Sequence, residues 1–172
     1  MAAENIETFS IGAVPHFPAE IDTDGSFQSV WSTFYKSAEF NDFFNRLVAL
    51  NVPLEVYSIT QFAPENFIQW FGLLIPDQNV SLPSGWLNLD LPAGEGVWAE
   101  EKNLGWKVLP VEFAIQLVYN SANKDNVKLP NRISHSDKPY LIEKINLTKD
   151  LVEPQKHRYF IYQGTEEEMF ED

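Results

Sequence analysis

The chain has 172 residues, of which 44% are hydrophobic and 22% charged, so it holds enough apolar material for one folded domain and does not resemble a disordered polypeptide. Its 12 basic residues are outnumbered by 25 acidic ones, and the net charge of −13 argues against a nucleic-acid partner. No apolar run reaches the roughly 18 residues of a membrane-spanning helix, so no membrane association is expected. The absence of cysteine excludes disulfides and, with a start that does not resemble a signal peptide, favours a cytoplasmic location.

The first half of the chain predicts the order strand, helix, strand, strand. Strands are expected at Thr8–Val14, Leu54–Ile59 and Phe67–Ile75, where apolar and β-branched residues dominate. A helix is expected to begin near Ser26, after a run of helix-capping residues. Its apolar stripe changes phase near Ser37, which indicates a kink or a second helix.

The second half repeats this order. The strand pieces within Leu87–Glu100 are interrupted by Pro92-Ala93-Gly94, which indicates a bulge or a sharp bend because proline cannot donate to the hydrogen-bond ladder. The spacing of apolar residues predicts a helix over Trp106–Asn120. Two further strands are expected at Tyr140–Ile145 and His157–Tyr162.

These elements predict an α+β fold made of two strand-helix-strand-strand repeats, over 8–75 and 87–162. The repeats would share one antiparallel sheet with two helices on one face, because antiparallel sheets commonly bury a single face under helices. Residues 1–164 are expected to form a single domain. An acidic tail over 165–172 would follow it as a solvated end.

Two motifs stand in order within this pattern. The first is Leu82-Pro83-Ser84-Gly85-Trp86 followed by Leu89-Asp90-Leu91-Pro92-Ala93-Gly94, and the second is Pro139-Tyr140-Leu141-Ile142-Glu143. Together with the repeated strand-helix-strand-strand order, these two motifs resemble the GyrI-like small-molecule-binding domain, which also occurs as the effector-binding domain of AraC-type and MerR-type regulators. The resemblance covers Thr8 to Tyr162. It implies an aromatic-lined cleft that binds hydrophobic, often cationic, compounds, with the glutamate of the second motif projecting into it.

Glu143 is a carboxylate within an apolar strand. Alternation along the strand puts it on the face of Leu141 and Ile145, opposite Lys144. On this pattern alone, an exposed Glu143 paired with a lysine is an equal alternative, and the resemblance favours the buried position. A carboxylate in an aromatic cavity can attract an organic cation or act as a general base.

The chain contains five Trp, and its aromatic content is 14%. A large aromatic core is the alternative to an aromatic pocket for each of these side chains. Histidines at 16, 135 and 157 are far apart and lack the spacing of metal ligands, so neither a metal nor a cofactor is expected. The residues predicted to surround Glu143 as ligand contacts are Trp98, Trp70, Tyr57, Trp31 and Tyr140.

Three functions stay open. The leading hypothesis is the binding of a hydrophobic, often cationic, small molecule in the cleft, with Glu143 as the polar anchor. In the second, the same cleft hydrolyses a strained or electrophilic small molecule, with Glu143 as the catalytic base and Trp98 holding the substrate; the resemblance permits this because some free-standing members are hydrolases. In the third, the chain is an acidic inhibitor that binds a protein partner through its surface charge. A cavity beside Glu143 would favour the first two hypotheses and a solid core the third.

Overall fold

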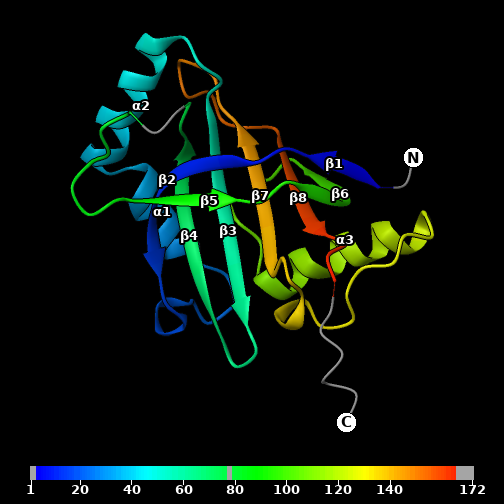
Figure 1. The fold of residues 1–172 in the computed structure, drawn as a ribbon. Helices are drawn as coiled ribbons and strands as arrows, with labels where there is room; N and C mark the ends of the chain where they lie inside the picture. The colour runs from blue at the N-terminus through cyan, green and yellow to red at the C-terminus, as the bar shows by residue number, and fades with distance from the viewer. Residues whose placement is uncertain (1–2, 77–78, 166–172) are drawn as a thin grey trace.

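The structure is a computed structural model that describes residues 3–76 and 79–165. Its sheet has eight antiparallel strands in the order β1-β6-β8-β7-β3-β4-β2-β5 (Figure 1). The strands are β1 (Glu4–Ile6), β2 (Phe9–His16), β3 (Glu55–Ala63), β4 (Asn66–Leu74), β5 (Leu87–Leu91), β6 (Gly94–Lys102), β7 (Tyr140–Asn146) and β8 (Lys156–Tyr162). The helices of the described residues are α1 (Gln28–Tyr35), α2 (Ala38–Leu50) and α3 (Val111–Lys124), with short 3-10 helices at Pro18–Glu20 and Ile133–His135. Most of the predicted acidic tail, residues 166–172, lies outside the described residues.

The strand order is symmetric about the β3–β7 pair. If β1 to β4 are exchanged for β5 to β8, the sheet reads the same from its opposite end. The long segments β1–β2 and β5–β6 each pair with both halves of the chain, since β2 pairs with β4 and β5 while β6 pairs with β8 and β1. The two segments cross the near side of the other strands in Figure 1. The predicted α+β fold, an antiparallel sheet with helices, is therefore confirmed. The described residues form three helices where two were predicted, because the first predicted helix is divided into α1 and α2, and strand β1 was not predicted.

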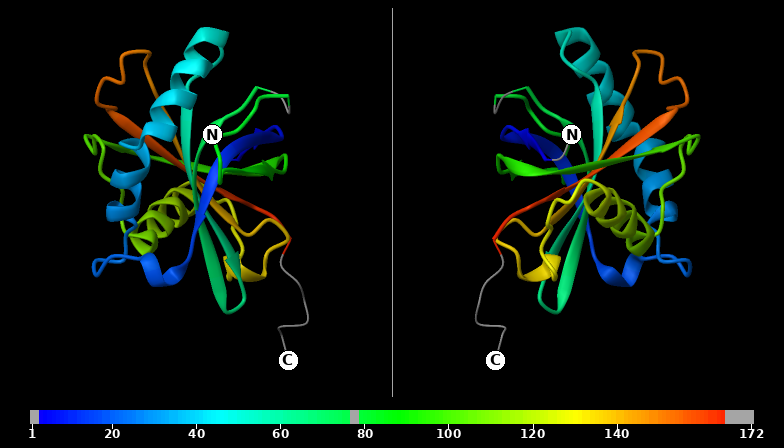
Figure 2. Two further views of the ribbon diagram at one scale, coloured as in Figure 1. Left: turned by 90° about the vertical axis from the view of Figure 1, so that its left-hand side faces the viewer. Right: turned by 90° about the vertical axis from the view of Figure 1, so that its right-hand side faces the viewer.

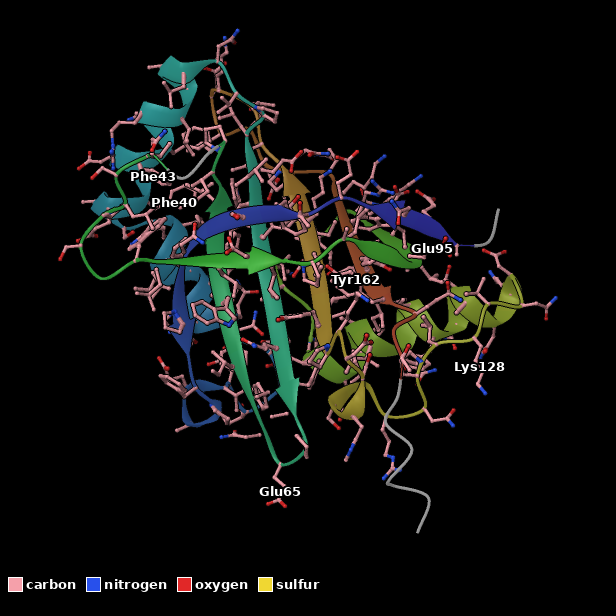
Figure 3. The ribbon with its side chains drawn as sticks, viewed as in Figure 1. Phe40, Phe43, Glu65, Glu95, Lys128 and Tyr162 are labelled. Carbon is pink, nitrogen blue, oxygen red and sulfur yellow. The ribbon has the colours of Figure 1, made fainter. Side chains whose placement is uncertain are left out.

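The predicted break between β5 and β6 is present. β5 ends at Leu91 and β6 begins at Gly94, so Pro92 falls where the chain passes from pairing with β2 to pairing with β8. The Tyr162 hydroxyl donates a hydrogen bond to the Pro92 carbonyl at 2.6 Å. Tyr162 is fully buried behind the crossing strands (Figure 3), so this bond ties the bend to the interior of the sheet.

The helices lie on one side of the sheet and the crossing strands on the other (Figure 2). On the helix side, α1 and α2 bury an aromatic cluster against β3 and β4, and α3 packs small residues against β6 and β8. On the other side, a second core fills the curl of the sheet. The main members of the α1–α2 cluster are Trp31, Phe34, Phe40, Phe43, Phe44, Leu47 and Phe71, and those of the second core are Ile11, Tyr57, Ile59, Trp70, Ile142, Phe160 and Tyr162.

The predicted break near Ser37 separates α1 from α2. The Ser37 hydroxyl donates to the Phe34 carbonyl at 2.7 Å and accepts from the Phe40 amide at 3.1 Å. It therefore closes one helix and caps the next, as serine does at helix N-termini.

The helix predicted over Trp106–Asn120 is wrong at its N-terminal end. Residues 103–110 form an irregular segment, here called the strap, that runs from β6 to α3. Pro110 occupies the N-cap of α3, and a proline disfavours helical geometry in the residue before it. Gly105 has a φ of +61°, in the left-handed region, which also stops a helix there. No helix in the described ranges is long and apolar enough to cross a membrane.

Candidate functional site

Glu143 lies on the helix-covered face of β7. It is paired with Ser58 of β3 on one side and with Tyr159 of β8 on the other, so it stands at the centre of the sheet. Its exposure is only 5%, which makes it a buried carboxylate. Lys144 points to the opposite face and its Nζ lies 3.4 Å from Glu55. The lysine next in sequence is therefore not the counter-charge of Glu143.

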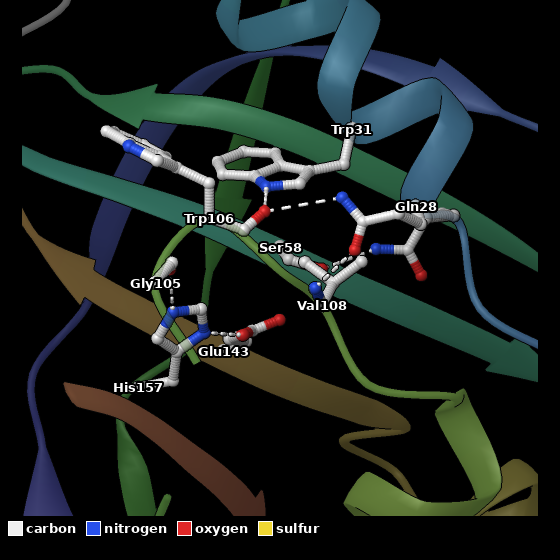
Figure 4. Close-up of polar contacts among 9 residues, drawn as sticks. Gln28, Trp31, Ser58, Gly105, Trp106, Val108, Glu143 and His157 are labelled. Atoms are coloured by element: carbon white, nitrogen blue, oxygen red, sulfur yellow. Dashed lines mark hydrogen bonds and ion pairs between the residues drawn. The ribbon is translucent and has the colours of Figure 1, made fainter. Parts of the chain in front are cut away.

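The partner of Glu143 is His157, whose side chain is fully buried. Its Nδ1 lies 2.5 Å from Glu143 Oε2, and its Nε2 lies 2.8 Å from the Gly105 carbonyl oxygen (Figure 4). A carbonyl oxygen can only accept, so Nε2 carries a hydrogen, and a second hydrogen must lie between Nδ1 and the carboxylate.

The electrostatics of this pair favour an imidazolium beside a carboxylate. Burial by itself disfavours the charged ring, but the hydrogen bond and charge of Glu143 and the Gly105 carbonyl outweigh it and raise the pKa of His157 above its ordinary value. A buried carboxylate and a buried imidazolium sum to zero charge. The site is therefore electrically neutral as it stands.

Polar side chains continue across the floor of the site. Gln69 accepts from the Thr60 hydroxyl at 2.6 Å and donates to the Ser58 hydroxyl at 2.7 Å. Tyr159 Oη is buried and makes no hydrogen bond within the described part of the chain. Its burial and the nearby Glu143 charge raise the pKa of this phenol above its ordinary value. The floor thus places the Glu143 carboxylate and the Tyr159 hydroxyl beneath the strap.

The strap covers this floor. The Trp106 carbonyl accepts hydrogen bonds from Trp31 Nε1 at 2.8 Å and from Gln28 Nε2 at 3.3 Å, and the Val108 amide donates to Gln28 Oε1 at 2.8 Å (Figure 4). The Trp106 ring also stacks on Tyr35, with centroids 4.6 Å apart. With Gly105 bound to His157, both α1 and β8 hold the strap in place.

Only a small cavity is left beneath the strap. Its volume is about 20 Å³, enough for one water molecule but not for an organic ligand. Apart from the polar floor, its walls are apolar. The lining residues are Phe27, Ser58, Thr60, Gln69, Phe71, Val108, Leu109, Val111, Ala114, Leu141, Glu143 and Tyr159.

The structure does not gather the predicted aromatic residues around Glu143. Trp31 lies on the helix face and holds the strap. Four others belong to the core on the opposite face of the sheet, namely Tyr57, Trp70, Trp98 and Tyr140. The pairing of β3 with β7 explains this, because Tyr57 is opposite Lys144 and shares its face. These four side chains could contact a ligand only from the other side of the sheet.

Sequence reasoning missed His157, Gln28 and Trp106. On β8, His157 and Tyr159 alternate with Arg158, which places the first two on one face. That signal was present, but the register of β8 against β7 is needed to bring His157 to Glu143. The strap contacts depend on tertiary structure alone. Among the described residues no group of three or more His, Asp or Glu side chains could hold a metal ion.

Among the open grooves that the described residues form elsewhere on the surface, two contain aromatic side chains. One, of about 430 Å³, includes Val30, Phe34 and Trp86, with Glu20 and Glu39 also in its wall. The other, of about 870 Å³, runs beside β2 and β5 and includes Phe9 and Tyr140. Both are large enough for a small molecule without any rearrangement, so they are the competing locations in any binding experiment.

No protein-family model matches the chain, and no curated protein does. Two solved structures share its fold. An integron cassette protein, VCH_CASS2, from the mobile metagenome of Vibrio cholerae is 12% identical over 93% of each chain, with a TM-score of 0.53. SAV2435, solved bound to tetraphenylphosphonium, is 7% identical over 93% of this chain and 91% of its own, with a TM-score of 0.51. At such identities the likeness shows the fold alone, and this fold is consistent with the predicted GyrI-like architecture.

Proposed function

We propose that this protein binds a hydrophobic organic cation in the cleft between α1 and α3, with Glu143 as the anchor. The observation that carries the proposal is a carboxylate with 5% exposure at the centre of the sheet, walled by apolar and aromatic side chains and covered by an irregular segment. Burying Glu143 and its partner His157 together removes both groups from water, and such a buried pair adds little to stability, so a binding role explains the arrangement better than folding does. The tetraphenylphosphonium bound to the structural neighbour SAV2435 is a ligand of this class.

Binding requires the strap to move, because about 20 Å³ cannot hold such a ligand. The strap is the segment best suited to do so. It has no regular secondary structure, and the side chains of Leu104, Trp106 and Val108 are only partly buried. Segments with few fully buried contacts open at lower free energy than the core. Displacing the strap exposes Trp31 and the polar floor without disturbing any strand.

The test is titration with tetraphenylphosphonium, followed by calorimetry and tryptophan fluorescence. Replacing Glu143 by Gln keeps the shape of the site and removes its charge, so we expect affinity for tetraphenylphosphonium to fall by about 2–3 kcal/mol, the Coulomb energy of two unit charges about 6–8 Å apart at an effective dielectric constant of about 20. The matched control is Glu65→Gln, since Glu65 at the tip of the β3–β4 hairpin points away from the molecule (Figure 3). Trp31→Phe and Trp106→Phe should remove most of the fluorescence change, and Trp70→Phe and Trp98→Phe should not.

If Glu143→Gln binds as tightly as the natural protein, the ligand lies elsewhere. Glu39→Gln would then identify the 430 Å³ groove as its location if affinity falls. That result would overturn the proposed site.

The hydrolase hypothesis is the second candidate. It is favoured by the Glu143–His157 pair, since a carboxylate and an imidazole in contact can move a proton. Trp98 cannot hold a substrate against Glu143, because it lies on the opposite face, so that role would pass to Trp31. Under this hypothesis Glu143→Gln abolishes turnover while a neutral ligand still binds. A cytoplasmic location stays a prediction for either function.

A further inference from the structure

The closed site already holds a basic group against Glu143, because both ring nitrogens of the buried His157 face oxygen acceptors. His157 donates through Nδ1 to Glu143 and through Nε2 to the Gly105 carbonyl, so the carboxylate is neutralised from within the protein. A cationic ligand brought to Glu143 would be the second positive charge beside one buried carboxylate. In a low-dielectric site that arrangement is unfavourable, and like charges lower the pKa of a neighbouring basic group.

We infer that His157 is a specificity-determining residue of the proposed cleft: it is the internal counter-cation of Glu143, a cationic ligand takes its place, and one proton leaves the protein on binding. The inference rests on the proposed function. The imidazolium N–H bond breaks with its electron pair staying on nitrogen, the proton passes to water, and no covalent bond forms to the ligand. Site charge is zero before binding and zero after it.

Movement of the strap contributes to the same exchange. The strap carries the Gly105 carbonyl, which is one of the two acceptors that hold the imidazolium. When the strap opens to admit a ligand, this acceptor is withdrawn and the charged ring loses part of its stabilisation. Entry of the ligand and loss of the proton are therefore linked through one hydrogen bond.

Among the described residues, three carboxylates and one phenol are the acidic titratable groups near His157. Glu101 of β6 is its cross-strand partner, and Glu153, in the turn before β8, lies against Gly105. Both carboxylates favour the imidazolium, as Glu143 of β7 does. Tyr159 of β8 shares the face, and its buried hydroxyl stays neutral because its pKa is raised.

Lys107 of the strap is exposed, and two further cations near the site face away from it. Lys144 pairs with Glu55, and the Arg158 guanidinium lies 4.2 Å from the centre of the Trp98 ring on the opposite face. No Lys or Arg is among the described residues that line the cavity, and α1 and α3 contribute no titratable side chain there. Within the described chain, His157 is therefore the cation that a ligand must replace.

The experiment uses tetraphenylphosphonium because its charge is permanent and it has no proton of its own to lose. Calorimetry at one pH in two buffers of different ionisation enthalpy measures the protons released. We expect release to approach one proton at pH values where His157 is charged in the free protein. Over that range Kd should fall about tenfold for each pH unit gained, and then level off, as linkage to one proton requires.

His157→Gln removes the titrating group. This variant should release no proton, and its Kd should not depend on pH between about 5.5 and 8.5, around the ordinary histidine pKa. His135→Gln is the matched control, because His135 is not among the residues that line the cavity. A second measurement needs no variant: triphenylphosphine oxide, a neutral molecule of similar shape, should bind the natural protein without proton release.

The outcomes separate the two proposals. Cation binding that depends on Glu143 but releases no proton, or releases the same amount from His157→Gln, would overturn the role of His157 and leave the proposed function standing. Absence of cation binding, or binding that Glu143→Gln does not weaken, would contradict the proposed function and this inference with it.

Discussion

At the scale of single residues, the Glu143–His157 pair sets the character of the site. Removing one member of a buried ion pair leaves an uncompensated charge and typically costs about 3–5 kcal/mol, whereas an amide in place of the carboxylate can still donate to the imidazole. Glu143→Gln is therefore a gentler change than Glu143→Ala. The pair also means that Glu143 is not a free carboxylate in the closed molecule, which the sequence pattern alone does not indicate.

The pair should make stability depend on pH. The folded-state pKa of His157 is raised above its ordinary value of 6.5, so its contribution is fully present below about pH 6.5 and is lost as pH rises through the raised value. Each unit of that rise is worth about 1.4 kcal/mol. Urea unfolding from pH 5.5 to 9 should therefore show the stability difference between the natural protein and His157→Gln shrinking as pH increases. A difference that grows with pH would show that His157 is held in its neutral form.

At the scale of elements, the position of the strap decides whether the site above Glu143 is closed or open to a ligand. Gln28 makes two of its hydrogen bonds, one to the Trp106 carbonyl and one from the Val108 amide. Both partners belong to the strap, and both hydrogen bonds are only partly buried. The strap should therefore respond to changes in α1 without loss of the sheet.

Gln28→Ala tests this separation. Losing two hydrogen bonds of about 0.5–1.5 kcal/mol each should lower the free energy of strap opening by about 1–3 kcal/mol while the sheet keeps its protection. Hydrogen exchange followed by mass spectrometry should show faster exchange over residues 103–110, and tetraphenylphosphonium should bind faster. Gln116→Ala, on an exposed turn of α3, is the control and should change neither quantity. Faster exchange spread over β3 and β7 would mean that the strap is part of the cooperative core.

Elements were predictable from the sequence where their signal is local. Alternation, apolar spacing and the prolines located the strands, the break near Ser37 and the bend at Pro92. The face occupied by Glu143 relative to Lys144 follows from alternation alone. Cross-strand neighbours do not, because register depends on how the segment 147–155 connects β7 to β8. This is why His157 was missed. Tyr57 was placed on the wrong side of the sheet because the pairing of β3 with β7, which the sequence does not reveal, puts it opposite Lys144 and away from Glu143.

At the scale of the whole molecule, the symmetry of the strand order determines the interior position of Glu143, whereas the net charge belongs mainly to the exterior. The mirrored strand order brings β3 and β7 together at the centre, so Glu143 stands where the two halves meet. The net charge of −13, by contrast, is carried mostly by exposed carboxylates. A buried anchor and an acidic exterior can both attract a cation. Salt weakens the attraction of the cation to the exterior more strongly than its attraction to the buried anchor.

Salt dependence therefore distinguishes the cleft from the acidic surface. The Debye length is about 10 Å at 0.1 M salt, so attraction by exposed carboxylates is screened, while a contact within the protein is screened much less. We expect Kd for tetraphenylphosphonium to change by less than about threefold between about 0.15 and 0.6 M NaCl, because the relevant charge on Glu143 is buried. In Glu143→Gln the weaker residual binding should become the more salt-sensitive, since only the surface then attracts the ligand. A loss of tenfold or more in the natural protein, unchanged by Glu143→Gln, would assign the cation to the exterior. That result would favour the hypothesis of an acidic surface that binds a basic protein partner, whose complex should weaken with salt to the same degree.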